Sequence, residues 1–243
     1  MANGSGSRGR GSGGGARRGS GARPAPAKRS PKAQAPRPRP VPSPAPEPPR
    51  TFVLGAIPGS TPGKWIGLWR ERMPHVPLEL REIAVETQRA DLDDVDAALV
   101  RLPVAASDDL HLIELYEEQP VVVMSADSHL TAADDLAAAD LVGEVVIVPA
   151  DDVLALRIPD AVAPAFAPPS DTAEAIATVA AGVGVVIVPM SLARAHQRRD
   201  VEYRVLRDGP VSTVALAWLR DRTTADVETF VGIVRGRTAR SSR

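Results

Sequence analysis

The sequence predicts an α/β fold, and three observations support this class. Short apolar runs rich in β-branched residues, such as GVVIVP at 184–189, are typical of buried strands. Stretches with apolar residues three or four positions apart lie between these runs and predict amphipathic helices. The two kinds of segment alternate from residue 51 to about residue 236, an order that favours largely parallel sheets.

The composition of the chain changes near residue 50. The first fifty residues hold eleven prolines, nine glycines, eleven Lys or Arg and a single acid, Glu47, so we predict a disordered basic tail over 1–50. The tail has a net charge of +10, whereas the other 193 residues carry 18 Lys or Arg and 29 acids, a net charge of −11. Such a tail is suited to non-specific DNA contact, to contact with the acidic body, or to solubility alone. Residues 237–243 are predicted to form a short C-terminal tail.

Several classes of function find no support in the sequence. The chain has no cysteine, which excludes disulfides and fits a cytoplasmic protein, and it has no apolar run long enough for a membrane span or a secretory signal. Its four histidines are far apart, so no metal site is expected. The acidic run DLDDVD at 91–96 lacks the central glycine of a calcium loop and has Leu102 in place of the last glutamate. No nucleophile elbow, dinucleotide fingerprint or phosphate loop is present, so we expect no catalytic residues and no cofactor.

The first predicted unit is a strand, a loop and a helix. An apolar strand at 51–57 precedes the turn-rich loop PGSTPG at 58–63. Thr61 is expected to cap the following helix and Pro62 to occupy its first position. The helix's free N–H groups and positive dipole end favour a carboxylate or similar anion, with an ordinary ligand-free turn as the alternative. One face of this helix is apolar: Trp65, Leu68, Trp69 and Met73.

The remaining elements follow in chain order. Asp171 and Glu174 predict a capping box at a helix start, and Gly182 predicts its end. Four prolines between 150 and 170 predict a loop with an edge strand. Strands are predicted at 77–85, 95–100, 112–116, 120–125, 145–148, 184–189, 201–206 and 211–219, and helices at 86–94, 134–139, 171–182, 191–199 and from about 224.

Four segments of the body resemble the effector-binding (substrate-binding) domain of LysR-type transcriptional regulators. They are LGAIPGSTPG with the following helix and RERMPHVPLEL, then ADLDDVDAALVRLP, then ELYEEQPVVVMSADSHLTAADDLAAADL, and finally TAEAIATVAAGVGVVIVPMSLAR. Together they cover 51–236 in the family's order. That family normally begins with a winged helix-turn-helix and a linker helix; here the basic tail stands in their place, and the 150–170 region is shorter and richer in proline than usual.

The resemblance implies two Rossmann-like lobes with a hinge and an interlobe cleft, as in type 2 periplasmic binding proteins. Lobe I would comprise 51–122 and 214–236, and lobe II 123–213, within a substrate-binding domain at 51–236. The chain would cross near 121–125 and 211–214. A homodimer is also implied, because domains of this family pair side by side.

The resemblance also implies a set of ligand-binding positions. Arg101 would hold a carboxylate through its two-pronged guanidinium, with a surface ion pair as the alternative. Asp171 would repel an anion, so we expect the neutral part of the ligand near that helix end. The ligand-binding residues carried over by position are Ser60, Thr61, Thr87, Arg101, Pro103, Ser125, Ser170 and Thr172.

Three functions are compatible with these observations. The leading interpretation is a cytoplasmic sensor of the LysR type that binds a small, anionic metabolite as its effector. It would take part in transcription regulation through a full-length regulator partner or through its basic tail. A stand-alone small-molecule-binding module with no nucleic-acid role is the second interpretation, and an enzyme on the same fold is the third.

Overall fold

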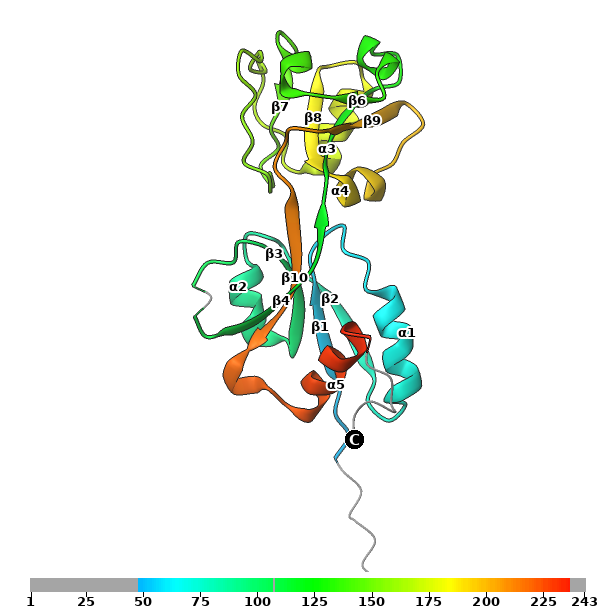
Figure 1. Ribbon diagram of the computed structural model, residues 1–243, viewed down its shortest axis with the longest axis vertical. Coiled ribbons are helices and arrows are strands. Elements are labelled where there is room, and N and C mark those ends of the chain that lie inside the picture. The colour runs from blue at the N-terminus through cyan, green and yellow to red at the C-terminus, as the bar shows by residue number, and fades with distance from the viewer. Residues whose placement is uncertain (1–47, 107, 237–243) are drawn as a thin grey trace, which may run out of the picture. The chain divides into compact units, whose positions relative to one another are not determined.

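The computed structural model describes residues 48–106 and 108–236. The predictions for residues 1–47 and 237–243 lie outside this part of the chain. The described residues form two lobes, each built on a mixed five-stranded sheet with helices packed on it (Figure 1). The predicted α/β class with two lobes is therefore confirmed. Within the described residues, no helix is long and apolar enough to cross a membrane.

Lobe I is built on a sheet with the strand order β2-β1-β3-β10-β4. The first three strands are parallel, and β10 runs antiparallel to both β3 and β4. Its strands are β1 (Phe52–Ala56), β2 (Leu78–Glu82), β3 (Ala97–Arg101), β4 (Leu110–Glu118) and β10 (Ser212–Leu219). Its helices are α1 (Gly63–Arg72), α2 (Gln88–Asp91) and α5 (Ala225–Val234), with the 3-10 turns η1 (Leu92–Asp94) and η4 (Arg220–Arg222).

Three aromatic rings form the centre of the lobe I core. The Phe52 ring from β1 lies 4.5 Å from Trp69 of α1 and 5.2 Å from Phe230 of α5, measured between ring centroids. All three side chains are buried. The Trp69 indole N–H donates to the Val76 carbonyl at 2.8 Å, so its one polar group is satisfied inside the core. These contacts fix both helices to one face of the sheet.

Lobe II is built on a sheet with the strand order β6-β9-β5-β8-β7. The predicted helix start at Asp171 is confirmed, because the Asp171 carboxylate accepts from the Glu174 N–H at 2.8 Å. The Glu174 carboxylate accepts from the Ser170 N–H at 2.7 Å and not from that of Asp171, so the predicted capping box forms in only one direction. The strands are β5 (Pro120–Ser125), β6 (Asp135–Leu136), β7 (Val146–Ile147), β8 (Val185–Pro189) and β9 (Val201–Leu206). The helices are α3 (Thr172–Ala180) and α4 (Met190–Ala195), with η2 (His129–Ala132) and η3 (Ala138–Leu141).

The prediction of largely parallel sheets is wrong. Of the eight strand pairings in the described residues, four are antiparallel. In lobe I the antiparallel strand is β10, which returns from lobe II and enters the sheet between β3 and β4. A buried apolar run predicts a strand but contains no information on its direction, so the sequence pattern could not show this.

Two local predictions are also wrong. The segment predicted as a helix at 134–139 forms β6 and the start of η3, because β6 pairs with β9 and the Asp140 carboxylate accepts from the Ala137 N–H at 2.8 Å. Tertiary pairing here overrides the helix propensity of alanine. Thr61 does not cap α1; the residue at the cap position is Pro62, and no side chain accepts a hydrogen bond there.

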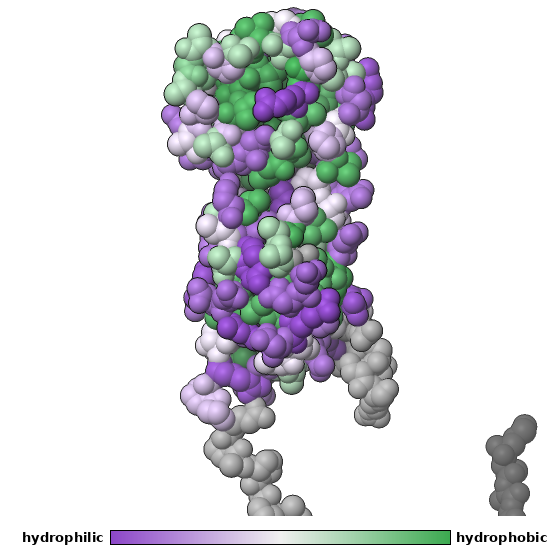
Figure 2. All heavy atoms as spheres, turned by 90° about the vertical axis from the view of Figure 1, so that its left-hand side faces the viewer, coloured by the Kyte–Doolittle hydropathy of each residue, from purple (hydrophilic) through white to green (hydrophobic). Residues whose placement is uncertain are grey.

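The proline-containing region between β7 and α3 is a long loop. Its only ladder contact within the described residues is a single bridge between Val145 and Val162, so the expected edge strand is reduced to one residue pair. Several apolar side chains of this loop remain exposed, among them Val162 at 47% and Phe166 at 42%. Figure 2 shows hydrophobic surface gathered on lobe II on the side where this loop lies, whereas lobe I is mostly hydrophilic there.

The chain passes between the two sheets twice. Strand β4 ends at Glu118 in the first sheet and β5 begins at Pro120 in the second, so the first crossing is at Gln119. The return lies between Leu206 of β9 and Ser212 of β10. The boundaries expected at 122/123 and 213/214 fall inside β5 and β10. We therefore propose 51–118 and 212–236 as lobe I and 120–206 as lobe II.

The lobes touch where the first loop of lobe I meets α4 of lobe II. Gly59 has a φ angle of +82°, and a Cβ atom placed on it would lie 2.5 Å from Ser191 Oγ and 3.2 Å from Leu192 Cδ2. The Ser191 hydroxyl itself donates to Glu118 at 2.9 Å. Any other residue here would therefore require the Ser191 and Leu192 side chains to move.

Truncating the aromatic core should destabilise lobe I strongly. We expect Phe52→Ala to lower the free energy of unfolding by about 3–5 kcal/mol, because it leaves a cavity beside Trp69 and Phe230. Urea denaturation followed by circular dichroism measures this loss. The matched control is Leu80→Ala on β2, which is 49% exposed and should cost less than about 0.5 kcal/mol. Equal effects of the two substitutions would contradict the assignment of the core.

The destabilisation caused by the contact at Gly59 can be measured apart from that caused by backbone strain. Gly143 serves as the reference, because it has the same φ angle of +82° and no atom within 4 Å of a Cβ placed on it. Gly143→Ala should cost about 1–2 kcal/mol from the left-handed backbone alone. Gly59→Ala should cost more, since Ser191 must also move away from Glu118. Thermal unfolding of both variants tests this, and equal losses would show that the lobes do not touch at Gly59 in solution.

Candidate functional site

Two cavities lie between the lobes, and the Gly59 contact separates them. The larger has a volume of about 610 Å³ and the smaller about 240 Å³. Gly59 and Ser191 line the larger cavity, whereas the adjacent residues Pro58 and Leu192 line the smaller one. Each cavity has walls from both lobes, so both are positioned to respond to hinge motion.

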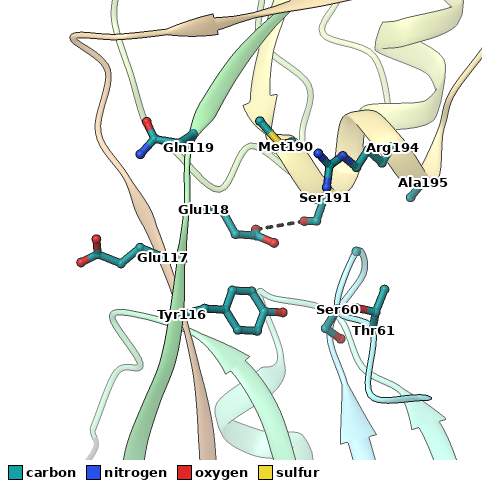
Figure 3. A pocket seen from close by; sticks show the side chains of 11 residues that line it. Ser60, Thr61, Tyr116, Glu117, Glu118, Gln119, Met190, Ser191, Arg194 and Ala195 are labelled. Atoms are coloured by element: carbon teal, nitrogen blue, oxygen red, sulfur yellow. Dashed lines mark hydrogen bonds between the residues drawn. The ribbon is translucent and has the colours of Figure 1, made fainter. Parts of the chain in front are cut away.

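The larger cavity lies between the first loop and the end of β4 on one side and α4 on the other (Figure 3). In Figure 3, Ser60 and Thr61 lie below α4, and the Glu118–Ser191 hydrogen bond crosses between the lobes. The pKa of the Tyr116 hydroxyl is raised, first by burial and then by Glu118, while Arg101 acts in the opposite direction. The lining residues are Gly59, Ser60, Thr61, Tyr116, Glu117, Glu118, Gln119, Met190, Ser191, Arg194 and Ala195.

The smaller cavity combines an apolar lining with several charged groups. Its lobe I wall comes from the loop after β1, the end of β2 and the end of β3, which are the carboxyl ends of three parallel strands. In open α/β sheets this is the edge at which ligands bind. The lining residues are Pro58, Glu82, Ala84, Val85, Glu86, Arg101, Asp151, Val153, Asp171, Ala173, Leu192 and His196.

Arg101 is the most constrained residue of the smaller cavity. Its backbone is held by Gln88, whose amide nitrogen donates to the Arg101 carbonyl and whose amide oxygen accepts from the Arg101 N–H, both at 2.8 Å. Its side chain is only 2% exposed, and Nη1 donates to Glu118 at 2.9 Å and also to the Ser212 hydroxyl. Two segments of lobe I thus hold the guanidinium, and a third holds the Arg101 backbone.

Two donor atoms of this guanidinium form no hydrogen bond to the described residues. Nε and Nη2 of Arg101 are buried and have no hydrogen-bond partner within residues 48–106 and 108–236. Buried donors are almost always paired, because a lost hydrogen bond at such a site costs about 1–3 kcal/mol. Both atoms also have almost no accessible surface, so a group with two acceptor atoms, such as a carboxylate, would pair with them only after the groups that cover them move.

The structure brings three of the eight expected ligand-binding residues to the interlobe cavities, but not to the same one. Ser60 and Thr61 line the larger cavity, and the Ser60 hydroxyl donates to the Ile57 carbonyl at 2.7 Å. Arg101 lines the smaller cavity, and the ion pair considered as its alternative role is present but buried. The expectation of one site containing all three residues is therefore not met by this geometry.

The other five expected residues line neither interlobe cavity. The Thr87 hydroxyl donates to Asp91 at 2.7 Å, and Pro103 is exposed. Ser125 ends β5, a full strand length from the crossing at Gln119. Ser170 and Thr172 flank the cavity residue Asp171, but their hydroxyls donate to Glu174 at 2.8 Å and to Asp151 at 3.0 Å.

Sequence reasoning missed most of the charged residues around the smaller cavity. Glu82 is the last residue of β2, Glu86 lies in the loop after it, and Asp151 lies in the loop after β7. Only Glu86 carried a signal in the sequence, since it directly follows the strand predicted at 77–85, and the carboxyl ends of parallel strands share one edge of a sheet. No group of three or more His, Cys, Asp or Glu side chains in the described part of the chain is arranged to hold a metal ion.

Comparisons with solved structures support the same fold. The effector-binding domain of a BenM variant is 20% identical with a TM-score of 0.64, and the match covers 79% of this chain and 95% of that one. The reduced OxyR regulatory domain from Pseudomonas aeruginosa is 22% identical with a TM-score of 0.60, covering 77% and 98%. The BenM effector-binding domain with its effector benzoate is 19% identical with a TM-score of 0.63, covering 79% and 93%.

No curated protein matches the chain. The family model described as the LysR substrate binding domain matches residues 46–239, which is most of the chain and includes both lobes. This family comprises non-enzymatic, effector-binding modules of transcription regulators. The chain belongs to the LysR substrate-binding domain family.

Proposed function

We propose that this chain senses a small metabolite with a carboxylate or similar anionic group, and that the effector binds in the smaller interlobe cavity. The observation that carries this proposal is the pair of unpartnered, buried donors on Arg101. Once ligand binding uncovers Nε and Nη2, a carboxylate would accept from both in the two-pronged geometry that guanidinium groups favour. In the BenM structure the effector is benzoate, which is itself a carboxylate.

The cavity walls explain how binding would be signalled. Arg101 and Val85 belong to lobe I, whereas Val153, Ala173 and Leu192 belong to lobe II. A ligand that touches both walls stabilises the closed arrangement by its extra contacts there and so shifts the population of hinge states. The Arg101–Glu118–Ser191 chain of hydrogen bonds connects the ligand position to the contact between the lobes.

The output of this sensor would be transcription regulation, as in other members of the family. We propose that the chain acts in the cytoplasm, where the DNA is, as a homodimer and through a full-length regulator partner or its basic tail. The charge of the tail supports the last route, because eleven Lys or Arg within fifty residues suit phosphate backbones of any sequence.

Effector binding should be lost when the guanidinium is removed. We expect a carboxylate metabolite at a hundred times its Kd to stabilise the full chain by about 2.7 kcal/mol, which raises the melting temperature by roughly 5–11 °C. Arg101→Gln should abolish this rise, whatever its effect on basal stability. Arg204→Gln is the control for loss of an arginine elsewhere, because Arg204 is half-buried and donates to the Ala133 and Thr131 carbonyls within lobe II, at 2.7 Å each.

The variant Ser60→Ala/Thr61→Ala distinguishes the two cavities. If the effector binds beside Arg101, this double variant should keep the thermal response. A response that survives Arg101→Gln and disappears in Ser60→Ala/Thr61→Ala would instead place the effector in the larger cavity. No response in a broad panel of carboxylates, aromatic acids and amino acids would contradict a sensing role.

The tail should bind DNA without sequence preference. In gel-shift titrations, the full chain should bind two unrelated duplexes equally, and its affinity should fall by about a thousandfold or more between 50 and 200 mM salt. Residues 48–243, with a negative net charge, should not bind either duplex. Absence of binding by the full chain at low salt would favour the stand-alone small-molecule-binding module over a role with DNA.

A further inference from the structure

We infer that the effector carries a cationic group in addition to its carboxylate, so that it is a small aliphatic zwitterion of the amino-acid type. This inference rests on the proposed function, because it assumes that a carboxylate binds to Arg101 in the smaller cavity. It concerns the chemistry of the remaining part of the ligand, which the guanidinium alone does not determine.

The charges around the cavity are strongly unbalanced. Among the described residues, four carboxylates line it, two from lobe I and two from lobe II, whereas Arg101 is its only Lys or Arg and is already paired with Glu118. A ligand with negative charge alone would meet this excess of carboxylates, and like charges at short range in a partly desolvated site repel. The four carboxylates are those of Glu82, Glu86, Asp151 and Asp171.

These carboxylates are free to accept a ligand's donors. Within residues 48–106 and 108–236, none of the four forms an ion pair with a Lys, Arg or His. Asp151 accepts one hydrogen bond from Thr172 Oγ1 at 3.0 Å, and Asp171 accepts one from the Glu174 N–H at 2.8 Å. An ionised carboxylate has about four acceptor positions, so each retains capacity for an ammonium group.

An organic ammonium fits these groups better than a metal ion does. Calcium or magnesium requires several oxygens converging at about 2.0–2.6 Å, and the described residues contain no acidic group with such an arrangement. A metal ion or a simple amine would also leave the unpartnered Nε and Nη2 donors of Arg101 without an acceptor. Only a ligand with both signs of charge would pair with Arg101 and with the carboxylates.

The rest of the lining indicates the size and polarity of the ligand's carbon skeleton. The volume of about 240 Å³ is below the range of about 300–1,000 Å³ that drug-sized ligands occupy. The apolar side chains of Pro58, Val85, Val153 and Leu192 line the cavity, and no Phe, Tyr or Trp is among the lining residues. A short aliphatic chain therefore matches the cavity better than an aromatic ring.

The test compares one skeleton in three charge forms on the full chain. Leucine, 4-methylpentanoate and 3-methylbutylamine share an aliphatic skeleton, as do valine, 3-methylbutanoate and 2-methylpropylamine. Calorimetric titration should show that an amino acid binds at least about tenfold more tightly than its matched carboxylate or amine. In Glu82→Gln/Glu86→Gln this preference over the carboxylate should shrink by about tenfold.

The control variant Glu71→Gln/Glu79→Gln removes the same charge from exposed positions that line neither interlobe cavity, and it should keep the preference. Equal binding of carboxylate and amino acid would overturn the zwitterion inference but leave the proposed carboxylate sensor intact. A preference that survives Glu82→Gln/Glu86→Gln would also overturn the inference. Binding of the amine but not of the amino acid, or no binding by any of the six compounds, would also overturn the zwitterion inference, whereas the carboxylate sensor is decided by the broader thermal-shift panel.

Discussion

Arg101 and Glu118 form a buried ion pair between the two points at which the chain passes from one lobe to the other. Glu118 is the last residue of β4, just before the first crossing, and Ser212, which also accepts from Arg101, is the first residue of β10 after the second crossing. One guanidinium therefore bonds to both connections. Breaking a buried pair of this kind by removing one partner costs about 3–5 kcal/mol, since the other charge stays buried.

This pair also lies between the two cavities. Arg101 is part of the wall of the smaller cavity, Glu118 is part of the wall of the larger one, and the Ser191 hydroxyl connects Glu118 to lobe II. An occupant of either cavity thus contacts a member of the same hydrogen-bonded group. The separation of the two cavities depends on Gly59, whose missing side chain allows the first loop of lobe I to reach α4.

The sequence contained enough information for the fold class, for most elements and for the family, because these depend on local periodicity and on motifs that run along the chain. The strand at 184–189 and the helix start at Asp171 are examples, and both are local patterns. The direction of β10 and the pairing of β6 depend on residues far away in the sequence, so no local pattern reveals them.

The candidate site was only partly predictable for a similar reason. Arg101 was identified through its motif, but its pairing with Glu118 and Ser212 joins residues 17 and 111 positions apart. The division of the cleft is likewise a tertiary effect, since it places Ser60 and Arg101 on different sides of the Gly59 contact. No motif marks the acids Glu82, Glu86 and Asp151, and only the folded chain brings them together at one cavity.

The pairing of β4 with β10 has a consequence for how the molecule is assembled. The two strands are antiparallel neighbours with Glu118 opposite Ser212, so lobe II occupies the position of the turn in a hairpin. Lobe II is one continuous stretch of chain, whereas the sheet of lobe I lacks a central strand until residue 219 has been made. During synthesis, all of lobe II is made before β10. The β4–β10 pairing of lobe I can therefore form only after the segment that joins these two strands, lobe II itself, has been made.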